Sequence, residues 1–242
     1  KDQASGSFAG GTILENKPIG FPQDGGTQKP YSNLFYWANA WSDNGGLIGE
    51  HPHKMFEIMS FVIEGEIQHY DSKMDGWISL NKGDAQIIRS GNGITHAERI
   101  MEGGRMFQIW FDPNIKQSML KEATYDDYKS ADMKYHEENE IAYKDYIGNG
   151  GPIKMDSEGV LISELTLPAG NHQLKLDESK IHSYYFLGGE ALIDGQVLLE
   201  HDFVIVEDEG EINIVANSST RLFHIATPKQ LSYKTYLELV NN

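Results

Sequence analysis

Short runs of apolar and β-branched residues, most of them roughly five to eight residues long, recur along the chain between clusters of Gly, Asn and Asp. Such runs, separated by turn residues, are typical of an antiparallel sandwich or barrel and not of alternating strands and helices. We therefore predict an all-β fold. The predicted strands are Gly11–Leu14, Leu34–Ala40, Phe56–Ile63, Glu66–Tyr70, Ala85–Ile88, Arg105–Phe111, Val160–Leu167, Ser183–Leu187, Glu190–Ile193, Phe203–Val206, Glu211–Val215 and Arg221–Thr227.

One long polar stretch interrupts this rhythm. Residues 113–150 hold many Lys, Asp, Glu and Tyr and few aliphatic residues, which favours a solvated connector with at most one short helix. The pattern predicts an N-terminal domain over residues 1–130, a linker over 131–150 and a C-terminal domain over 151–242 that uses the same architecture again. The final stretch, 229–242, is expected to be a short helix or a strand.

Composition narrows the function classes. The chain has a net charge of −16, nine His and no Cys. The absence of Cys excludes disulfides and Cys-ligated zinc or iron–sulfur sites, and the negative charge disfavours direct binding to nucleic acid or anionic membranes. No apolar run approaches the ~18 residues of a membrane span, and residues 1–11 lack the apolar segment of a signal peptide. We expect a cytoplasmic protein, although a chain that begins at Lys1 leaves a removed leader open.

Candidate metal ligands are concentrated between residues 45 and 98. His51 and His53 form a His-x-His pair, and His96 and Glu98 form a His-x-Glu pair. Alternate residues of a strand share a face, so two adjacent strands would bring both pairs together. Glu57 shares the parity of the first pair if the pleat is regular. Imidazole and carboxylate ligands suit Fe(II), Mn(II), Ni(II) or Zn(II).

The other six histidines lack such a partner pair. We expect each of them to be a surface side chain or a hydrogen-bonded one, without a metal. They are His69, His136, His172, His182, His201 and His224.

The wider spacing resembles the cupins. Gly45 followed by His51-x-His53-x3-Glu57 resembles the first cupin motif, and the segment from Gly83 to His96 resembles the second. The stretches 51–57, 62–66 and 90–98 look more narrowly like the pirin branch. Arg89 stands where the usual cupin pattern has Pro, and Ile100 where it has Asn. Since pirins are bicupins, the resemblance implies two antiparallel, jelly-roll-like cupin β-barrels.

The resemblance also implies a ligand set. Pirins hold one metal, usually iron, in the N-terminal barrel, and the positions that correspond here are His51, His53, His96 and Glu98. Glu57 would then orient a histidine rather than bind the metal. One divalent ion is expected, most readily Fe(II), with Zn, Mn or Ni as alternatives. The C-terminal barrel is expected to be free of metal.

Several pirins are similar to quercetin 2,3-dioxygenases, which implies cleavage of a flavonol such as quercetin by O₂. Glu98 would be the catalytic base for the flavonol hydroxyl. Aromatic residues are expected to line the substrate pocket; they are Trp37, Trp41, Phe56, Phe107 and Trp110. The alternative is a non-enzymatic protein that senses metal or redox state and binds a transcription factor or a metabolic enzyme. A metal-dependent isomerase or another cupin that acts on a sugar or small acid is a third hypothesis.

Overall fold

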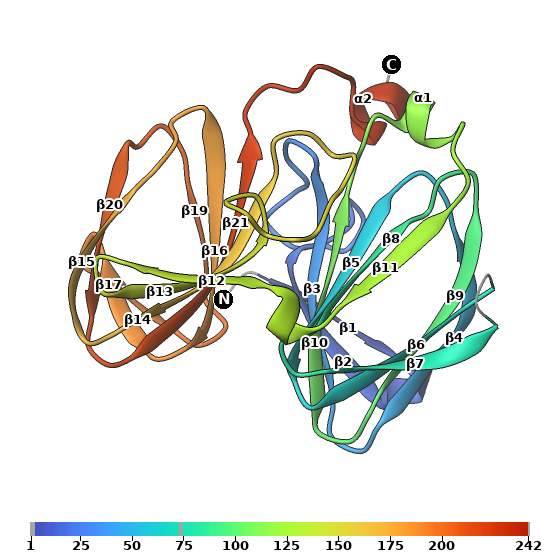
Figure 1. Cartoon of the computed structure of the whole chain (residues 1–242), viewed down its shortest axis with the longest axis horizontal. Coiled ribbons are helices and arrows are strands. Elements are labelled where there is room, and N and C mark those ends of the chain that lie inside the picture. Colours follow the sequence, from blue (N-terminus) through green and yellow to red (C-terminus); the bar gives the residue numbers. More distant parts are fainter. Residues whose placement is uncertain (1–2, 73–74, 242) are drawn as a thin grey trace. The chain divides into compact units, whose positions relative to one another are not determined.

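The structure is a computed structural model that describes residues 3–72 and 75–241. It consists almost entirely of antiparallel strands, which confirms the all-β class (Figure 1). The chain divides into two units. One contains residues 3–131 together with 155–158 and 232–241, and the other contains Asp132–Lys154 and Gly159–Leu231.

The N-terminal unit contains two sheets. The order of the seven-stranded sheet is β1-β2-β3-β10-β5-β8-β11, and that of the four-stranded sheet is β4-β9-β6-β7. The bounds are β1 Ala4–Phe8, β2 Ile13–Ile19, β3 Leu34–Ser42, β4 Gly46–His53, β5 Glu57–Glu64, β6 Glu66–Asp71, β7 Gly76–Asn81, β8 Ala85–Arg89, β9 Ile94–Ile100, β10 Gly104–Phe111 and β11 Thr124–Tyr128. Hydrogen bonding within each sheet ends at an edge strand, so the unit is an open sandwich and the expected closed barrel is wrong.

The inner faces of this sandwich form its core. One buried cluster includes Ile13, Val62, Ile67 and Ile100, and a second, rich in aromatic residues, includes Phe35 and packs against Trp110. Apolar residues on alternate positions of facing strands are removed from water together, and each fully buried side chain stabilises the fold by about 1.5–3 kcal/mol. The same alternation places polar residues of these strands at defined points of the interior.

The C-terminal unit is also built from two open antiparallel sheets, in the orders β12-β13-β14-β21-β16-β19 and β15-β20-β17-β18. Its strands are β12 Lys134–Glu138, β13 Ile141–Ile147, β14 Leu161–Leu167, β15 Gly170–Lys175, β16 Lys180–Gly188, β17 Glu190–Ile193, β18 Gln196–Leu199, β19 Phe203–Val206, β20 Glu211–Ala216 and β21 Thr220–Pro228. The segment 131–150 is therefore not a linker. It contains β12 and β13, whose buried residues such as Ile141 and Tyr146 were hidden among charged neighbours.

Helices are short in the described part of the chain, and none is long and apolar enough to cross a membrane. They are α1 Ile115–Ser118, α2 Tyr236–Val240 and the 3₁₀ turns η1 Ala9–Gly11 and η2 Ser130–Asp132.

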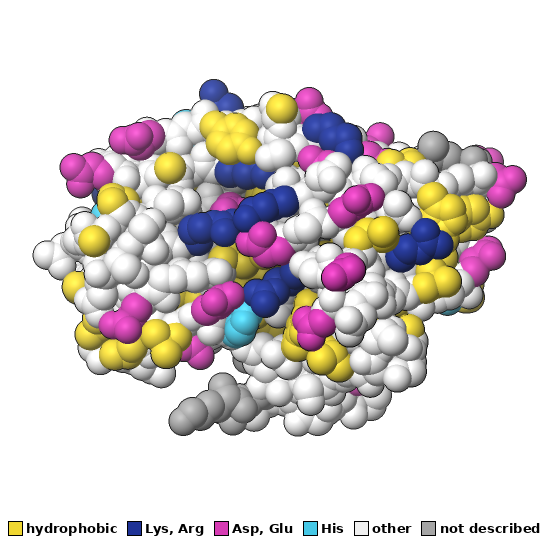
Figure 2. Space-filling view, turned by 90° about the horizontal axis from the view of Figure 1, so that it is seen from below, with side chains coloured by type: hydrophobic (Ala, Val, Ile, Leu, Met, Phe, Trp, Pro, Cys, Tyr) yellow, Lys and Arg dark blue, Asp and Glu magenta, His cyan; other side chains and the backbone are white. Residues whose placement is uncertain are grey.

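On the face in Figure 2, basic and acidic side chains are interspersed. Oppositely charged side chains also form exposed ion pairs, for example Lys82 with Glu64 and Lys121 with Asp156.

Of the two structures expected for residues 229–242, a short helix or a strand, the structure has the helix, α2. Thr235 and Glu238 form a capping box at its first turn. The Tyr236 backbone N–H donates to the carboxylate of Asp112, which directly follows β10, and the Tyr233 hydroxyl donates to the Asp112 carbonyl at 2.8 Å. Burial raises the pKa of Asp112 to about 7, although the bond from Tyr236 opposes the shift.

This raised pKa predicts a specific pH dependence of stability. Between pH 3.8 and about 7 the folded state holds a proton on Asp112 that the unfolded state has lost, so the free energy of unfolding falls as pH rises. The full effect would be at most about 4 kcal/mol. Asp112→Asn cannot ionise and keeps an acceptor for Tyr236. Urea unfolding should show the variant gaining stability relative to the native protein from pH 4.5 to pH 8; parallel pH profiles would contradict the prediction.

Candidate metal centre

Strands β4 and β9 carry the two histidine pairs, and one irregularity in their pairing aligns them. Ile48 lies opposite Glu98 and His51 lies opposite His96, so three steps on β4 match two steps on β9. The extra residue is a β-bulge at positions 49 and 50. With regular alternation Ile48 and His51 would point to opposite faces; the bulge lets both contribute to the interior.

Three imidazoles meet at this point. The ring centroids of His51, His53 and His96 lie 4.7, 4.5 and 4.6 Å apart in the three pairwise combinations. One ligand atom from each lies within 4.8 Å of the others. The Nε2 atoms of His51 and His96 are 3.0 Å apart. Two imidazole nitrogens bound at right angles to one ion, each at about 2.0–2.1 Å, would be about 3 Å apart.

The protonation of these rings suits a metal. His51 Nδ1 lies 2.8 Å from the Gly49 carbonyl, which can only accept, so Nδ1 carries the hydrogen and Nε2 keeps its lone pair. His53 Nε2 is buried without a hydrogen-bond partner among the described residues. Burial, together with the neighbouring histidines, lowers the pKa of His53 to about 3 and that of His96 to about 2. Both rings are therefore neutral near pH 7, as ligands must be.

Glu98 belongs to a second, overlapping group. Its carboxylate and the rings of His69 and His96 form another set of candidate ligand atoms within 4.8 Å. Ser60 donates to Oε1 of Glu98 at 3.1 Å, and the side-chain amide of Gln108 donates to Oε2. The four expected ligands therefore do not form one group. Three histidines form the first, and Glu98 adjoins it through His96.

His69 was expected to be a bystander, yet the structure places it beside the centre. Strand β6 pairs with β9, so that His69 lies opposite Glu98 and Asp71 lies opposite His96. His69 Nε2 is 3.4 Å from Oδ2 of Asp71, and both side chains are almost fully buried. The sequence could have indicated this position. Ile67, His69 and Asp71 occupy alternate positions of one strand, so if the apolar Ile67 faces the core, His69 and Asp71 face it too.

Comparisons with known proteins show which proteins the chain is similar to. The Pirin family matches residues 30–111. Pirin-1 of Arabidopsis thaliana is 26% identical over 179 residues, which cover 71% of this chain and 62% of the relative. Quercetin 2,3-dioxygenase of Escherichia coli K12 is 40% identical over 68 residues, covering 27% of this chain and 29% of the enzyme. The chain thus matches less than two thirds of the length of either relative.

A solved structure extends the likeness to both units. The bacterial pirin YhhW of Escherichia coli, in complex with nickel(II), superposes with a TM-score of 0.75 at 20% identity, over 94% of this chain and 96% of that one. Residues 30–111 are thus similar to the pirin family, and the fold of both units is similar to that of a bacterial pirin. At this identity the structural likeness establishes the fold, and the function of the protein has to be argued from its own residues.

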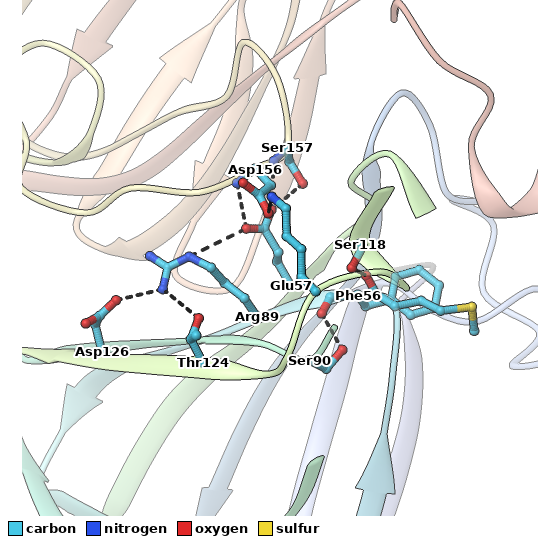
Figure 3. Close-up of polar contacts among 11 residues, drawn as sticks. Phe56, Glu57, Arg89, Ser90, Ser118, Thr124, Asp126, Asp156 and Ser157 are labelled. Atoms are coloured by element: carbon cyan, nitrogen blue, oxygen red, sulfur yellow. Dashed lines mark hydrogen bonds and ion pairs between the residues drawn. The ribbon is translucent and has the colours of Figure 1, made fainter. Parts of the chain in front are cut away.

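In this structure, Glu57 has other partners than the expected histidine. Its Oε1 accepts from the Asp156 N–H at 2.7 Å, and its Oε2 accepts from the Ser157 N–H at 2.8 Å and the Ser157 hydroxyl at 2.6 Å (Figure 3). Arg89 Nε lies 4.0 Å from Oε1, and this guanidinium also bonds Asp126 at 2.6 Å. Both oxygens of Glu57 are thus engaged with the segment 155–158. Burial raises its pKa, opposed by these hydrogen bonds.

Strand parity also separates the five aromatic residues expected in the pocket. Gln108 of β10 contacts Glu98, so its neighbour Phe107 points to the opposite face of the sheet. Trp37 lies there too, with its ring 5.4 Å from Phe107, and so does Trp41, which pairs with Arg105. These three side chains therefore do not line the metal centre, contrary to expectation.

The other two aromatic residues lie on the side of the histidines. The Trp110 ring meets His53 edge to face at 4.8 Å, and its Nε1 donates to Gln108 Oε1 at 3.2 Å. Phe56 lies 5.8 Å from Trp110. Phe21 and Tyr36 continue the cluster, with Phe21 at 5.3 Å from Trp110. An aromatic wall thus adjoins His53, and the polar end of Trp110 joins the hydrogen bonds around Glu98.

Replacing Glu57 tests its structural role against the role expected from sequence. Glu57→Ala would leave the buried Ser157 N–H and hydroxyl and the partly buried Asp156 N–H without their acceptor, which should cost about 2–4 kcal/mol of stability. Glu57→Gln, which retains one acceptor oxygen, should cost less. Urea unfolding measures the loss, and metal analysis of the folded Gln variant should give the native metal-to-protein ratio. A Gln variant that is stable but has lost its metal would restore the histidine-orienting role.

Proposed function

We propose that the first group, His51, His53 and His96, holds one divalent metal ion, with Glu98 as a further ligand. The 3.0 Å separation of the His51 and His96 Nε2 atoms carries this proposal, supported by the unpartnered His53 Nε2. A ligand set of imidazoles and one carboxylate suits Fe(II), Ni(II), Mn(II) or Zn(II). Fe(II) is the expected ion from the family, and nickel(II) is the ion named for the related pirin YhhW.

Three variants decide which histidine group binds the ion. His53→Ala/His96→Ala should lose the metal, since it removes two of three imidazoles from the first group and one from the second. His69→Ala should keep about one metal per chain, because His69 belongs only to the second group. Elemental analysis after dialysis measures all three, and circular dichroism verifies folding. Loss of metal in His69→Ala with retention in His51→Ala would place the ion in the second group.

We further propose that the protein is a dioxygenase that cleaves a flavonol such as quercetin with O₂. The name and partial similarity of the Escherichia coli quercetin 2,3-dioxygenase support this substrate class. The aromatic wall beside His53 supports a flat aromatic ligand, because offset or edge contacts of rings add about 0.5–1.5 kcal/mol to their burial. A bound metal ion supplies Lewis-acid polarisation of the substrate oxygen and a template for the reactants.

Glu98 is the residue we assign to proton transfer. It is buried at the shared edge of both histidine groups, and Ser60 and Gln108 each donate to one of its oxygens. These two donors fix the carboxylate plane, and each oxygen keeps a further lone pair for the proton of a substrate hydroxyl. Trp110 holds Gln108 through Nε1, so the aromatic wall and the base are oriented together.

Quercetin turnover tests the activity. The Fe(II)-loaded protein in air should bleach the flavonol absorbance, and Glu98→Gln should lower the rate by about 10²–10⁴-fold, the usual contribution of a general base. Glu102→Gln, which changes an exposed carboxylate, is the matched control and should keep the native rate. No turnover by fully metal-loaded protein would contradict the dioxygenase and favour the metal-sensing alternative.

A further inference from the structure

The C-terminal sandwich contains a cavity of about 510 Å³. It is lined from both sheets, by residues of β13, β14, β16 and β21 on one side and β15 on the other. Ligand pockets of proteins commonly occupy 300–1,000 Å³. This volume lies wholly within the unit that was expected to hold no metal.

Polar side chains occupy the inner face of the six-stranded sheet at this cavity. His224 of β21 pairs with Tyr184 of β16 and with Ser163 of β14, so these three share a face. Further along the same sheet the inward positions are apolar, including Leu165, Phe186 and Leu222 in one buried cluster. Buried polar groups cost stability unless they are hydrogen-bonded, so a polar group at one end of this face is unexpected for a purely structural core.

Hydrogen bonds fix the tautomers of the two histidines. His182 Nε2 lies 3.1 Å from the Asp177 carbonyl, which only accepts, so this nitrogen carries the hydrogen. In the neutral ring His182 Nδ1 is then an acceptor, and at 3.0 Å it receives the hydrogen of His224 Nε2. His224 Nδ1 is left as an acceptor, with no hydrogen-bond partner among the described residues. Burial lowers the pKa of His224 to about 3, which keeps this lone pair available.

Two tyrosines line the same cavity as His224. The Tyr184 ring stacks on His224 at 4.6 Å with an interplanar angle of 13°. Tyr143 lines the same cavity. Burial raises the pKa of both tyrosines, so their hydroxyls remain protonated. Neither hydroxyl has a hydrogen-bond partner among the residues that the structure describes.

The remaining lining determines the charge and shape of a ligand. Four leucines supply apolar wall, namely Leu161, Leu165, Leu174 and Leu176. The charged lining residues Glu138, Lys175 and Asp177 are all exposed, so the inner cavity is neutral. An anionic ligand would meet no buried positive charge there, and the buried Asp145, which accepts a hydrogen bond from Ser163, would repel it. The wall thus suits an uncharged, largely apolar molecule with a hydroxyl group.

We propose that this cavity is a second, metal-free binding site for a hydroxylated aromatic molecule of two or three rings. The ligand hydroxyl donates to Nδ1 of His224 and accepts from the hydroxyl of Tyr184, while its rings contact the leucines. The site is independent of the metal centre, because its residues all come from the C-terminal unit.

Fluorescence titration of the full-length, metal-loaded chain with 2-naphthol tests the proposal. One molecule should bind per C-terminal unit, and naphthalene, which lacks the hydroxyl, should bind about tenfold more weakly, the value of one net hydrogen bond. The anion 2-naphthoate should also bind more weakly. Equal affinity for naphthalene and 2-naphthol, or the absence of 2-naphthol binding, would overturn the proposal.

Variants locate the ligand. Tyr184→Phe keeps the ring and removes only the hydroxyl, so it should weaken 2-naphthol several-fold and leave naphthalene unchanged; a merely structural effect would change both. His224→Leu should weaken 2-naphthol about tenfold. His53→Ala, in the metal centre, should retain 2-naphthol binding. Loss of binding in His53→Ala with retention in Tyr184→Phe and His224→Leu would place the probe at the metal centre and refute the second site.

Discussion

A single extra residue in strand β4 is the constraint on which the candidate site depends. Two strands of a regular antiparallel pair can share inward positions only at even spacing, yet Ile48 of the core and His51 of the site are three residues apart. The bulge between them resolves this conflict. It lets one strand supply the core with Ile48 and the centre with His51 and His53, while its partner β9 supplies Glu98 and His96 without interruption.

Periodicity predicted most of the fold because alternating or continuous apolar runs report burial directly. Each strand predicted between residues 34 and 111 and between 160 and 227 has a counterpart in the structure, but β7, β15 and β18 within these ranges were not predicted. Strands β12 and β13 were missed because edge strands and strands with one solvated face carry charged residues, as Lys134–Glu138 does. Closure of the sheets was also overestimated, since pairing between the two edges is not encoded in local sequence.

Sequence patterns predicted some residues of the candidate site and missed others. The motif spacing brought His51, His53 and His96 into consideration, and the structure does gather them. Strand parity suggested that Glu57 faces the histidines. Its carboxylate instead accepts hydrogen bonds from a segment about a hundred residues later, and no local sequence pattern reports such a contact. Parity could have excluded Phe107 once Gln108 was placed inward, and it could have included His69. The cavity in the second sandwich stayed hidden because its histidines, at 182 and 224, form no short motif.

The return of residues 155–158 and 232–241 to the N-terminal unit bears on how the protein is made. During synthesis, residues 3–131 emerge from the ribosome before Asp156 and Ser157 do, so Glu57 lacks its hydrogen-bond donors at that stage, and Asp112 lacks Tyr236 for longer still. The N-terminal sandwich is complete only after residues 232–241 have emerged. Segments of the two sandwiches therefore alternate along the sequence. Neither sandwich is one continuous segment that could be transferred to another protein by itself.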